Sequence, residues 1–168
     1  MKQSTALLVA VIFASAVSAH AQAERGKAEA TIAGKKIAVD YGRPQLKGRD
    51  MLTRAPEGTV WRMGMNEATT IETAADLLFG DVTIPKGAYS LFAKRTAEKT
   101  WELIFNKQTG QWGTQHDASK DLAHVPLSWK TKDDSTETFT IDVVPTAQGG
   151  DFKMVWGTSV LETPFKVK

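Results

Sequence analysis

The stretch Phe139-Thr140-Ile141-Asp142-Val143 decides the fold, because its apolar and polar side chains alternate. Successive side chains of a β-strand point to opposite faces of a sheet, so this pattern predicts a strand with one face in a core. The same two-residue period recurs in four further segments, at residues 37–41, 101–105, 152–156 and 165–167. Helical periodicity is almost absent, and the chain is therefore predicted to be all-β.

Turn-forming residues divide these segments. Glycine reaches positive φ, proline fixes φ, and short Asp and Ser side chains bond to their own backbone. The spacing predicts an antiparallel β-sandwich, jelly-roll-like or barrel-like, of eight or nine short strands. Two long loops, at residues 42–59 and 106–121, are expected to carry function. The predicted turns are Ala33-Gly34, Gly80-Asp81, Pro85-Lys86-Gly87, Asp133-Asp134-Ser135 and Gln148-Gly149-Gly150.

The N-terminus has the order of a secretory signal: Lys2, an apolar stretch at residues 6–17, and small residues up to Ala23. About a dozen apolar residues are too few for a membrane-spanning helix, which needs roughly 20. We predict that residues 1–21 are a cleaved signal peptide, with cleavage after Ala23 as the alternative. Residues 22–168 are then a single domain, exported to the periplasm or the exterior and without a membrane span.

Composition excludes several classes of function. The chain has no cysteine, which rules out disulfides, thiolate metal sites and a cysteine nucleophile. Its net charge of +2 includes Lys2, so the mature domain is close to neutral and lacks the basic tract typical of nucleic-acid binding. We expect no nucleic-acid partner and no cofactor, and the sequence specifies no oligomeric state.

The densest polar cluster is Arg62, Asn66 and Glu67, in a segment that leads from the first long loop into a strand. If Gly64 makes a bend or bulge, these side chains could converge at a sheet edge and hold a polar ligand. The alternative is structural: Arg62 pairs with Glu67 or with a carboxylate from the facing sheet, and Asn66 caps a turn.

Arg43 and Trp112 complete the candidate binding residues. Pro44 keeps the backbone of Arg43 extended, so that its side chain either points into a cleft or bonds to loop carbonyls. Trp112 lies between glycines in the second loop, where it is either a stacking platform for a sugar or a plug at the end of the sandwich.

The sequence gives little indication of a catalytic site or a metal-binding site. His116 and His124, near Asp117 and Asp121, match no recognised zinc spacing and are expected to be solvated. Ser90 lacks the flanking glycines of a nucleophile elbow. No catalytic residue and no metal ligand are predicted.

Several segments together resemble a family of secreted bacterial proteins known as domain-of-unknown-function family 2911. The resemblance implies a secreted, β-rich domain and carries no activity or ligand with it. The chain departs from the family pattern at Gly42, where serine is usual, and at Met63, where threonine is frequent. The segments that carry the resemblance are residues 41–44, 47–49, 60–70, 84–92, 101–107 and 111–113.

Three functions follow as hypotheses. The first is a non-catalytic binding module for a small polar or carbohydrate-like ligand, held by Arg43, Arg62, Asn66, Glu67 and Trp112. The second is a hydrolase that uses Glu67 as acid or base with Arg62 as electrostatic stabiliser. The third is a structural or assembly protein of the cell envelope.

Overall fold

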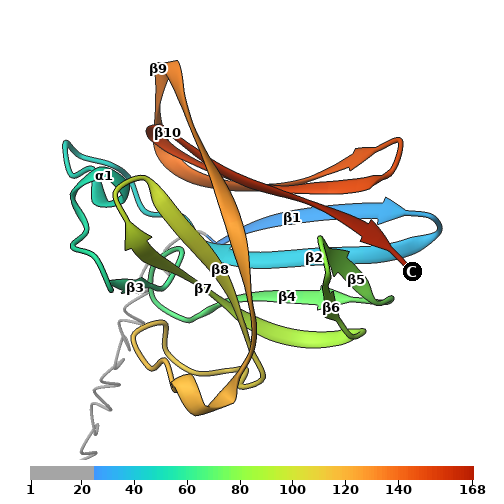
Figure 1. Ribbon diagram of the computed structural model, residues 1–168. Coiled ribbons are helices and arrows are strands. Elements are labelled where there is room, and N and C mark those ends of the chain that lie inside the picture. The colour runs from blue at the N-terminus through green and yellow to red at the C-terminus, as the bar shows by residue number, and fades with distance from the viewer. Residues whose placement is uncertain (1–24) are drawn as a thin grey trace, which may run out of the picture.

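The computed structural model describes residues 25–168 (Figure 1). The predicted signal peptide, residues 1–21, lies outside the described residues. Within the described part, no helix has both the length and the apolar character needed to cross a bilayer.

The described residues form ten strands, where eight or nine were expected, and almost no helix. The two short helices, α1 (Met51–Arg54) and a 3-10 turn (Ala118–Lys120), lie in the two long loops. The strands are β1 (Arg25–Ile32), β2 (Lys35–Gly42), β3 (Val60–Trp61), β4 (Thr69–Thr73), β5 (Leu77–Phe79), β6 (Val82–Ile84), β7 (Gly87–Ala97), β8 (Thr100–Asn106), β9 (Asp121–Thr146) and β10 (Gly149–Val167).

All strand pairs are antiparallel, and the strands form one continuous sheet in the order β1-β2-β4-β7-β8-β9-β10-β5-β6, with β3 paired to β7. The two longest strands, β9 and β10, bend sharply, so that the hairpin formed by the end of β9 and the start of β10 lies over β1 and β2 (Figure 1). The sheet thus folds over itself into a sandwich-like body. The all-β prediction is confirmed.

The core lies between the two layers. The alternating residues that predicted the fold are buried, with Phe139 and Met154 at 0% exposure. The Phe139 ring packs edge-on against Trp61, at 5.0 Å between centroids, and Trp61 stacks on Trp156 at 5.7 Å. These contacts join β3, β9 and β10, and such aromatic pairs add to the energy of burial.

One predicted turn is wrong. Asp133-Asp134-Ser135 does not end a strand, since β9 continues to Thr146. On β10, Gly157 pairs with Thr136 and Ser159 with Thr131, so residues 132–135 form a bulge opposite a single residue. Pairing with β10 resumes on both sides, and the short polar residues therefore bend the strand instead of reversing it.

Candidate functional site

The segment after β3 meets the second long loop through two backbone hydrogen bonds. The amide of Ala68 donates to the carbonyl of Gln111 at 3.0 Å, and the amide of Gly113 donates to the carbonyl of Asn66 at 2.8 Å. These bonds flank Glu67 and Trp112, which form an antiparallel bridge. Residues opposite each other in such a pair carry their side chains on the same side and close together. Glu67 and Trp112 therefore stand side by side.

The backbone conformation of this segment is unusual. Met63 and Asn66 have positive φ, at 50° and 63°, and the carbonyl of Met63 accepts a hydrogen bond from the Thr69 hydroxyl at 2.7 Å. The tight path also depends on Gly42, because a Cβ there would lie 2.1 Å from the carbonyl oxygen of Met65. The predicted bend at Gly64 is present, with φ of 152°.

Trp112 is exposed over 45% of its surface. The alternative in which it plugs the end of the sandwich is therefore wrong. Arg62 packs along the loop backbone, since a Cβ on Gly113 would lie 2.8 Å from Arg62 Cδ. Four of the five predicted residues, Arg62, Asn66, Glu67 and Trp112, are thus brought together by one bridge.

The partner of Glu67 is Arg25, a residue that the sequence analysis missed. Arg25 Nη1 lies 3.3 Å from Glu67 Oε2, and its Nη2 donates to the carbonyl of Ala68 at 3.4 Å. Its Nε also pairs with Asp40 on β2. Glu67 thus pairs with Arg25 and not with Arg62, the partner that the structural alternative named first. No local signal could reveal it, because Arg25 and Glu67 are 42 residues apart.

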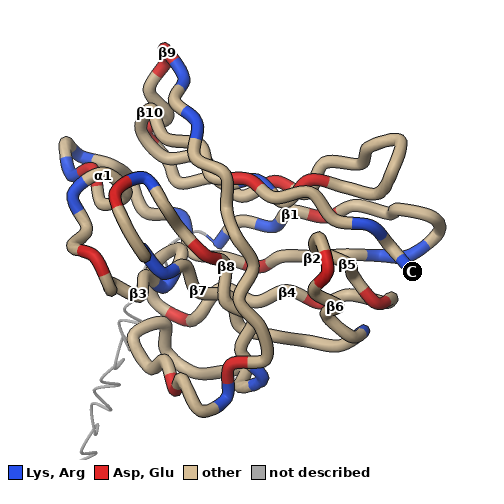
Figure 2. Tube along the Cα trace, viewed as in Figure 1, with Lys and Arg blue, Asp and Glu red and all other residues tan. Residues whose placement is uncertain are grey.

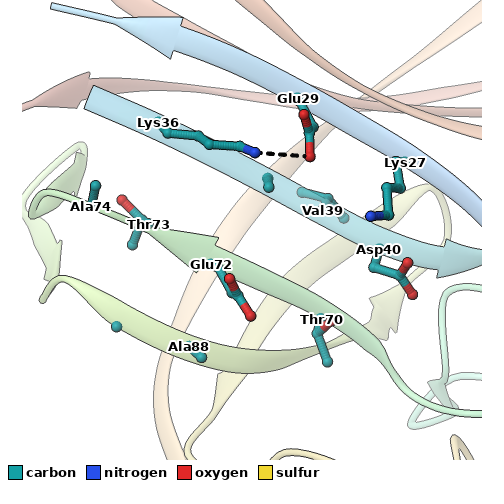
Figure 3. A pocket seen from close by; sticks show the side chains of 12 residues that line it. Lys27, Glu29, Lys36, Val39, Asp40, Thr70, Glu72, Thr73, Ala74 and Ala88 are labelled. Carbon is teal, nitrogen blue, oxygen red and sulfur yellow. Dashed lines mark ion pairs between the residues drawn. The ribbon is translucent and has the colours of Figure 1, made fainter. Parts of the chain in front are cut away.

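A groove of about 830 Å³ runs across the outer face of β1, β2, β4 and β7 (Figure 3). Its floor includes the small residues Ala38 and Ala88, and its walls carry charges of both signs. Lys36 and Glu29 form an ion pair of 3.2 Å across it. Asp40 lines the groove and also binds Arg25, which links the groove to Glu67 and Trp112. The polar lining is Lys27, Glu29, Lys36, Asp40, Thr70, Glu72 and Thr73.

The loop that carries Trp112 is fixed to the sheet by buried polar contacts. Ser90, which is fully buried, donates to Gln111 Oε1 at 3.2 Å. Asn106, also fully buried, donates from Nδ2 to Asp121 Oδ1 at 2.7 Å. Such bonds inside the protein hold a loop firmly, because breaking them leaves buried polar groups unpaired.

The two histidines also hold this loop. The His116 ring packs against Phe92 at a tilt of 55°, with 4.7 Å between centroids, and lies 2.9 Å from Asp121. His124 contacts Asp121 at 3.4 Å and Glu102 at 3.0 Å. His116 is thus packed and not solvated. In residues 25–168, no group of three or more His, Cys, Asp or Glu side chains has the geometry to hold a metal ion.

Asp117 starts the 3-10 turn of the same loop. Hydrogen bonds from the side chain and backbone of Ser119 lower the pKa of the Asp117 carboxyl below its usual value, with a smaller contribution from Lys120. The carboxylate therefore stays charged and keeps capping the turn.

Arg43 is separate from the other four predicted residues. It lines a different pocket, of about 490 Å³, which Met65 reaches from the segment between Arg62 and Glu67. The five residues thus belong to one region of the protein but not to one pocket.

One family of known proteins matches the chain over most of its length. The family model described as "Protein of unknown function (DUF2911)" matches residues 23–165. The chain belongs to the DUF2911 family. Neither a curated protein nor a solved structure matches it. The match covers every strand of the DUF2911 domain except the last two residues of β10, and it includes the groove and the bridge.

The arrangement in this DUF2911 domain is suited to recognition. An exposed indole offers a flat apolar surface, while the groove offers ammonium donors and carboxylate acceptors. All of these groups stand on paired strands or on a loop fixed by buried hydrogen bonds. Little ordering would be needed when a ligand binds, which favours affinity.

Proposed function

We propose that this DUF2911 protein is a non-catalytic binding module for a small polar ligand of carbohydrate type. The observation that supports it is the position of Trp112, exposed and beside Glu67, at the end of a chain of contacts through Arg25 and Asp40 to the groove. In this proposal the ligand lies in the groove and extends toward the indole.

The chemistry of the groove matches a hydroxylated, uncharged ligand. Each sugar hydroxyl both donates and accepts, and the lining supplies partners for both roles. Two lysines and three carboxylates line it, so the charges nearly balance and do not favour an ion of either sign. Sugar rings also present apolar C–H faces, which pack on an indole. The charged lining residues are Lys27, Lys36, Glu29, Asp40 and Glu72.

The two other hypotheses have less support. The Glu67 side chain is 49% exposed and paired with Arg25, whereas an acid–base catalyst is usually shielded from water. An assembly surface would need a contiguous apolar patch. Among residues 25–168, the large exposed apolar residues lie in α1, β3, the second long loop and β9: Met51, Val60, Trp112 and Val144.

Export is part of the proposal and depends on residues 1–21. Its test is expression of the full chain in a bacterium, followed by cell fractionation and N-terminal sequencing of the mature protein. A periplasmic or secreted protein that starts at Gln22 or Glu24 supports export, and an unprocessed cytoplasmic chain contradicts it.

The binding test uses the mature protein and a panel of neutral mono- and oligosaccharides, measured by isothermal titration calorimetry and by melting temperature. A ligand that binds only the folded state raises its melting temperature. Trp112→Ala and Glu72→Gln should each weaken binding about tenfold, or about 1.4 kcal/mol.

The matched control is Val144→Ala, since Val144 is about as exposed as Trp112, at 43%, but lies on β9. It should leave binding unchanged. Both Trp112→Ala and Val144→Ala should melt close to the wild type, because exposed side chains contribute little to stability. Saccharide binding that survives Trp112→Ala, or a panel without any binder, contradicts the proposal.

A further inference from the structure

A second pocket is lined in part by Met65, from the segment that carries Arg62 and Glu67. It has a volume of about 490 Å³ and shares no lining residue with the groove. Three of its seven lining residues are basic, and no acidic residue lines it. The lining residues are Arg43, Pro44, Gln45, Lys47, Arg49, Met65 and Thr138.

The backbone of this pocket is held in place by pairing with β9. The amide of Leu46 donates to the carbonyl of Glu137 at 2.7 Å, and the amide of Phe139 donates to the carbonyl of Pro44 at 2.9 Å. These bonds flank a bridge between Gln45 and Thr138. The side chains of such a pair stand close together on one side, so an amide and a hydroxyl project together.

A tight turn presents the basic residues. Lys47 and Gly48 have φ of 45° and 70°, and the amide of Arg49 donates to the carbonyl of Leu46 at 2.8 Å. Two successive left-handed residues closed by this bond are typical of a type I′ turn. Lys47 and Arg49 are thus carried by a defined loop, and Figure 2 shows basic positions gathered in the loop beside α1.

The three cations have no carboxylate partner. Within residues 25–168, Arg43, Lys47 and Arg49 form no ion pair. The nearby Glu137 instead uses Oε1 to accept a hydrogen bond from the backbone amide of Lys47 at 2.9 Å. The pocket therefore keeps an excess of positive charge in a domain that is close to neutral overall.

Arg43 is the least exposed of the three cations. Its Nε is buried and has no hydrogen-bond partner. Its aliphatic part is packed, since a Cβ on Gly26 would lie 2.7 Å from Arg43 Cδ and from the Tyr41 ring. Because its stem is packed, little side-chain freedom is lost when the guanidinium of Arg43 binds a ligand in the pocket that Arg43 lines.

We propose that this pocket binds a dianionic oxyanion group, phosphate or sulfate, free or as part of a small molecule. Guanidinium groups bind such oxyanions through paired N–H donors, and the lysine adds a point charge. Gln45 and Thr138 supply neutral donors to the remaining oxygens. Three positive charges favour a dianion over a monocarboxylate. The pocket is a second binding site, independent of the saccharide site proposed above.

The test measures binding of inorganic phosphate, inorganic sulfate and acetate to the mature protein by calorimetry, at constant ionic strength. Phosphate and sulfate should bind and acetate should not. A phosphorylated and a sulfated monosaccharide form two further arms. If a phosphorylated or sulfated monosaccharide binds more tightly than the corresponding inorganic ion, the natural ligand is a small molecule that carries this group. If both bind equally well, the natural ligand is the free ion.

Variants locate the site. Lys47→Gln and Arg49→Gln lie on the exposed turn and should each weaken phosphate binding about fivefold to tenfold without loss of folding. Arg43→Gln should abolish phosphate binding. If this variant fails to fold, Lys47→Gln and Arg49→Gln still test whether the pocket binds phosphate. The matched control is Arg54→Gln, an exposed arginine of the same loop that does not line the pocket and should bind as the wild type does.

The proposal is overturned if phosphate and sulfate do not bind at millimolar concentration, if acetate binds equally well, or if Arg54→Gln weakens binding as much as Arg49→Gln. Trp112→Ala should leave phosphate binding unchanged, because Trp112 lines no part of this pocket. Failure of this proposal is therefore distinguishable from failure of the saccharide proposal.

Discussion

Replacing Gly42 by alanine should displace the segment that carries Asn66 and Glu67. The new Cβ would lie 2.1 Å from the carbonyl oxygen of Met65 and 2.7 Å from its amide nitrogen. Ordinary contact begins at 3.4 Å, so the backbone must move by 3.4 − 2.1 = 1.3 Å. Both colliding atoms belong to the backbone and cannot rotate away. A Gly42→Ser substitution would meet the same atoms.

Overpacking of this kind costs about 1–3 kcal/mol. For a domain of this size, each kcal/mol lowers the melting temperature by about 2–4 °C, which gives a loss of about 2–12 °C for Gly42→Ala. The displacement also pulls Asn66 away from its bond to Gly113, so saccharide binding beside Trp112 should weaken in parallel.

Thermal unfolding followed by circular dichroism measures the first effect, and calorimetry measures the second. The control is Gly34→Ala, where φ is 73° and the space around the new Cβ is open. It should lose about 1–2 kcal/mol through backbone strain and leave ligand binding intact. The smallest expected loss is about 2 °C. A Gly42→Ala protein that melts within about 1 °C of the wild type would therefore refute the close packing of Met65 on β2.

Three further outcomes are expected. Burial, and next the charge of Asp76, raises the pKa of Tyr89, so its contribution to stability is full below about pH 10 and is lost as the pH rises through the raised pKa. Tyr89→Phe should reduce this alkaline loss of stability in denaturant titrations. Asp121→Asn removes the charge that holds two histidines, and amides around Trp112 should exchange hydrogen faster by mass spectrometry. Phe139→Ala empties a fully buried position and should cost about 3–5 kcal/mol of unfolding free energy, measured in urea.

The strands were predictable because burial follows a two-residue period. Phe139, Ile141 and Val143 are all buried, as their alternation with polar residues requires. The bulge at residues 132–135 was not predictable from the same reasoning. Turn residues favour a change of direction, but whether a strand ends or only bends depends on pairing with β10, which local sequence does not encode.

The candidate site was predictable only in its residue types. Arg62, Asn66 and Glu67 are close in sequence, so their shared location in the fold required no long-range information. Trp112 joins them through backbone pairing between two loops, and Arg25 joins them from the first strand. Both contacts depend on tertiary structure and leave no periodic or compositional trace.

Arg43 illustrates how backbone geometry decides which residues act together. It was grouped with Arg62 because an extended backbone before Pro44 could direct it into a cleft beside the same loop, yet it lines a pocket with Lys47 and Arg49 instead. The run from Arg43 to Arg49 holds three cations in seven residues, and Gly48 makes a left-handed turn possible within it. Pairing of residues 44–46 with β9 then fixes that turn beside Thr138. A cationic pocket is thus formed by a short local motif, provided that a long-range strand contact holds its ends.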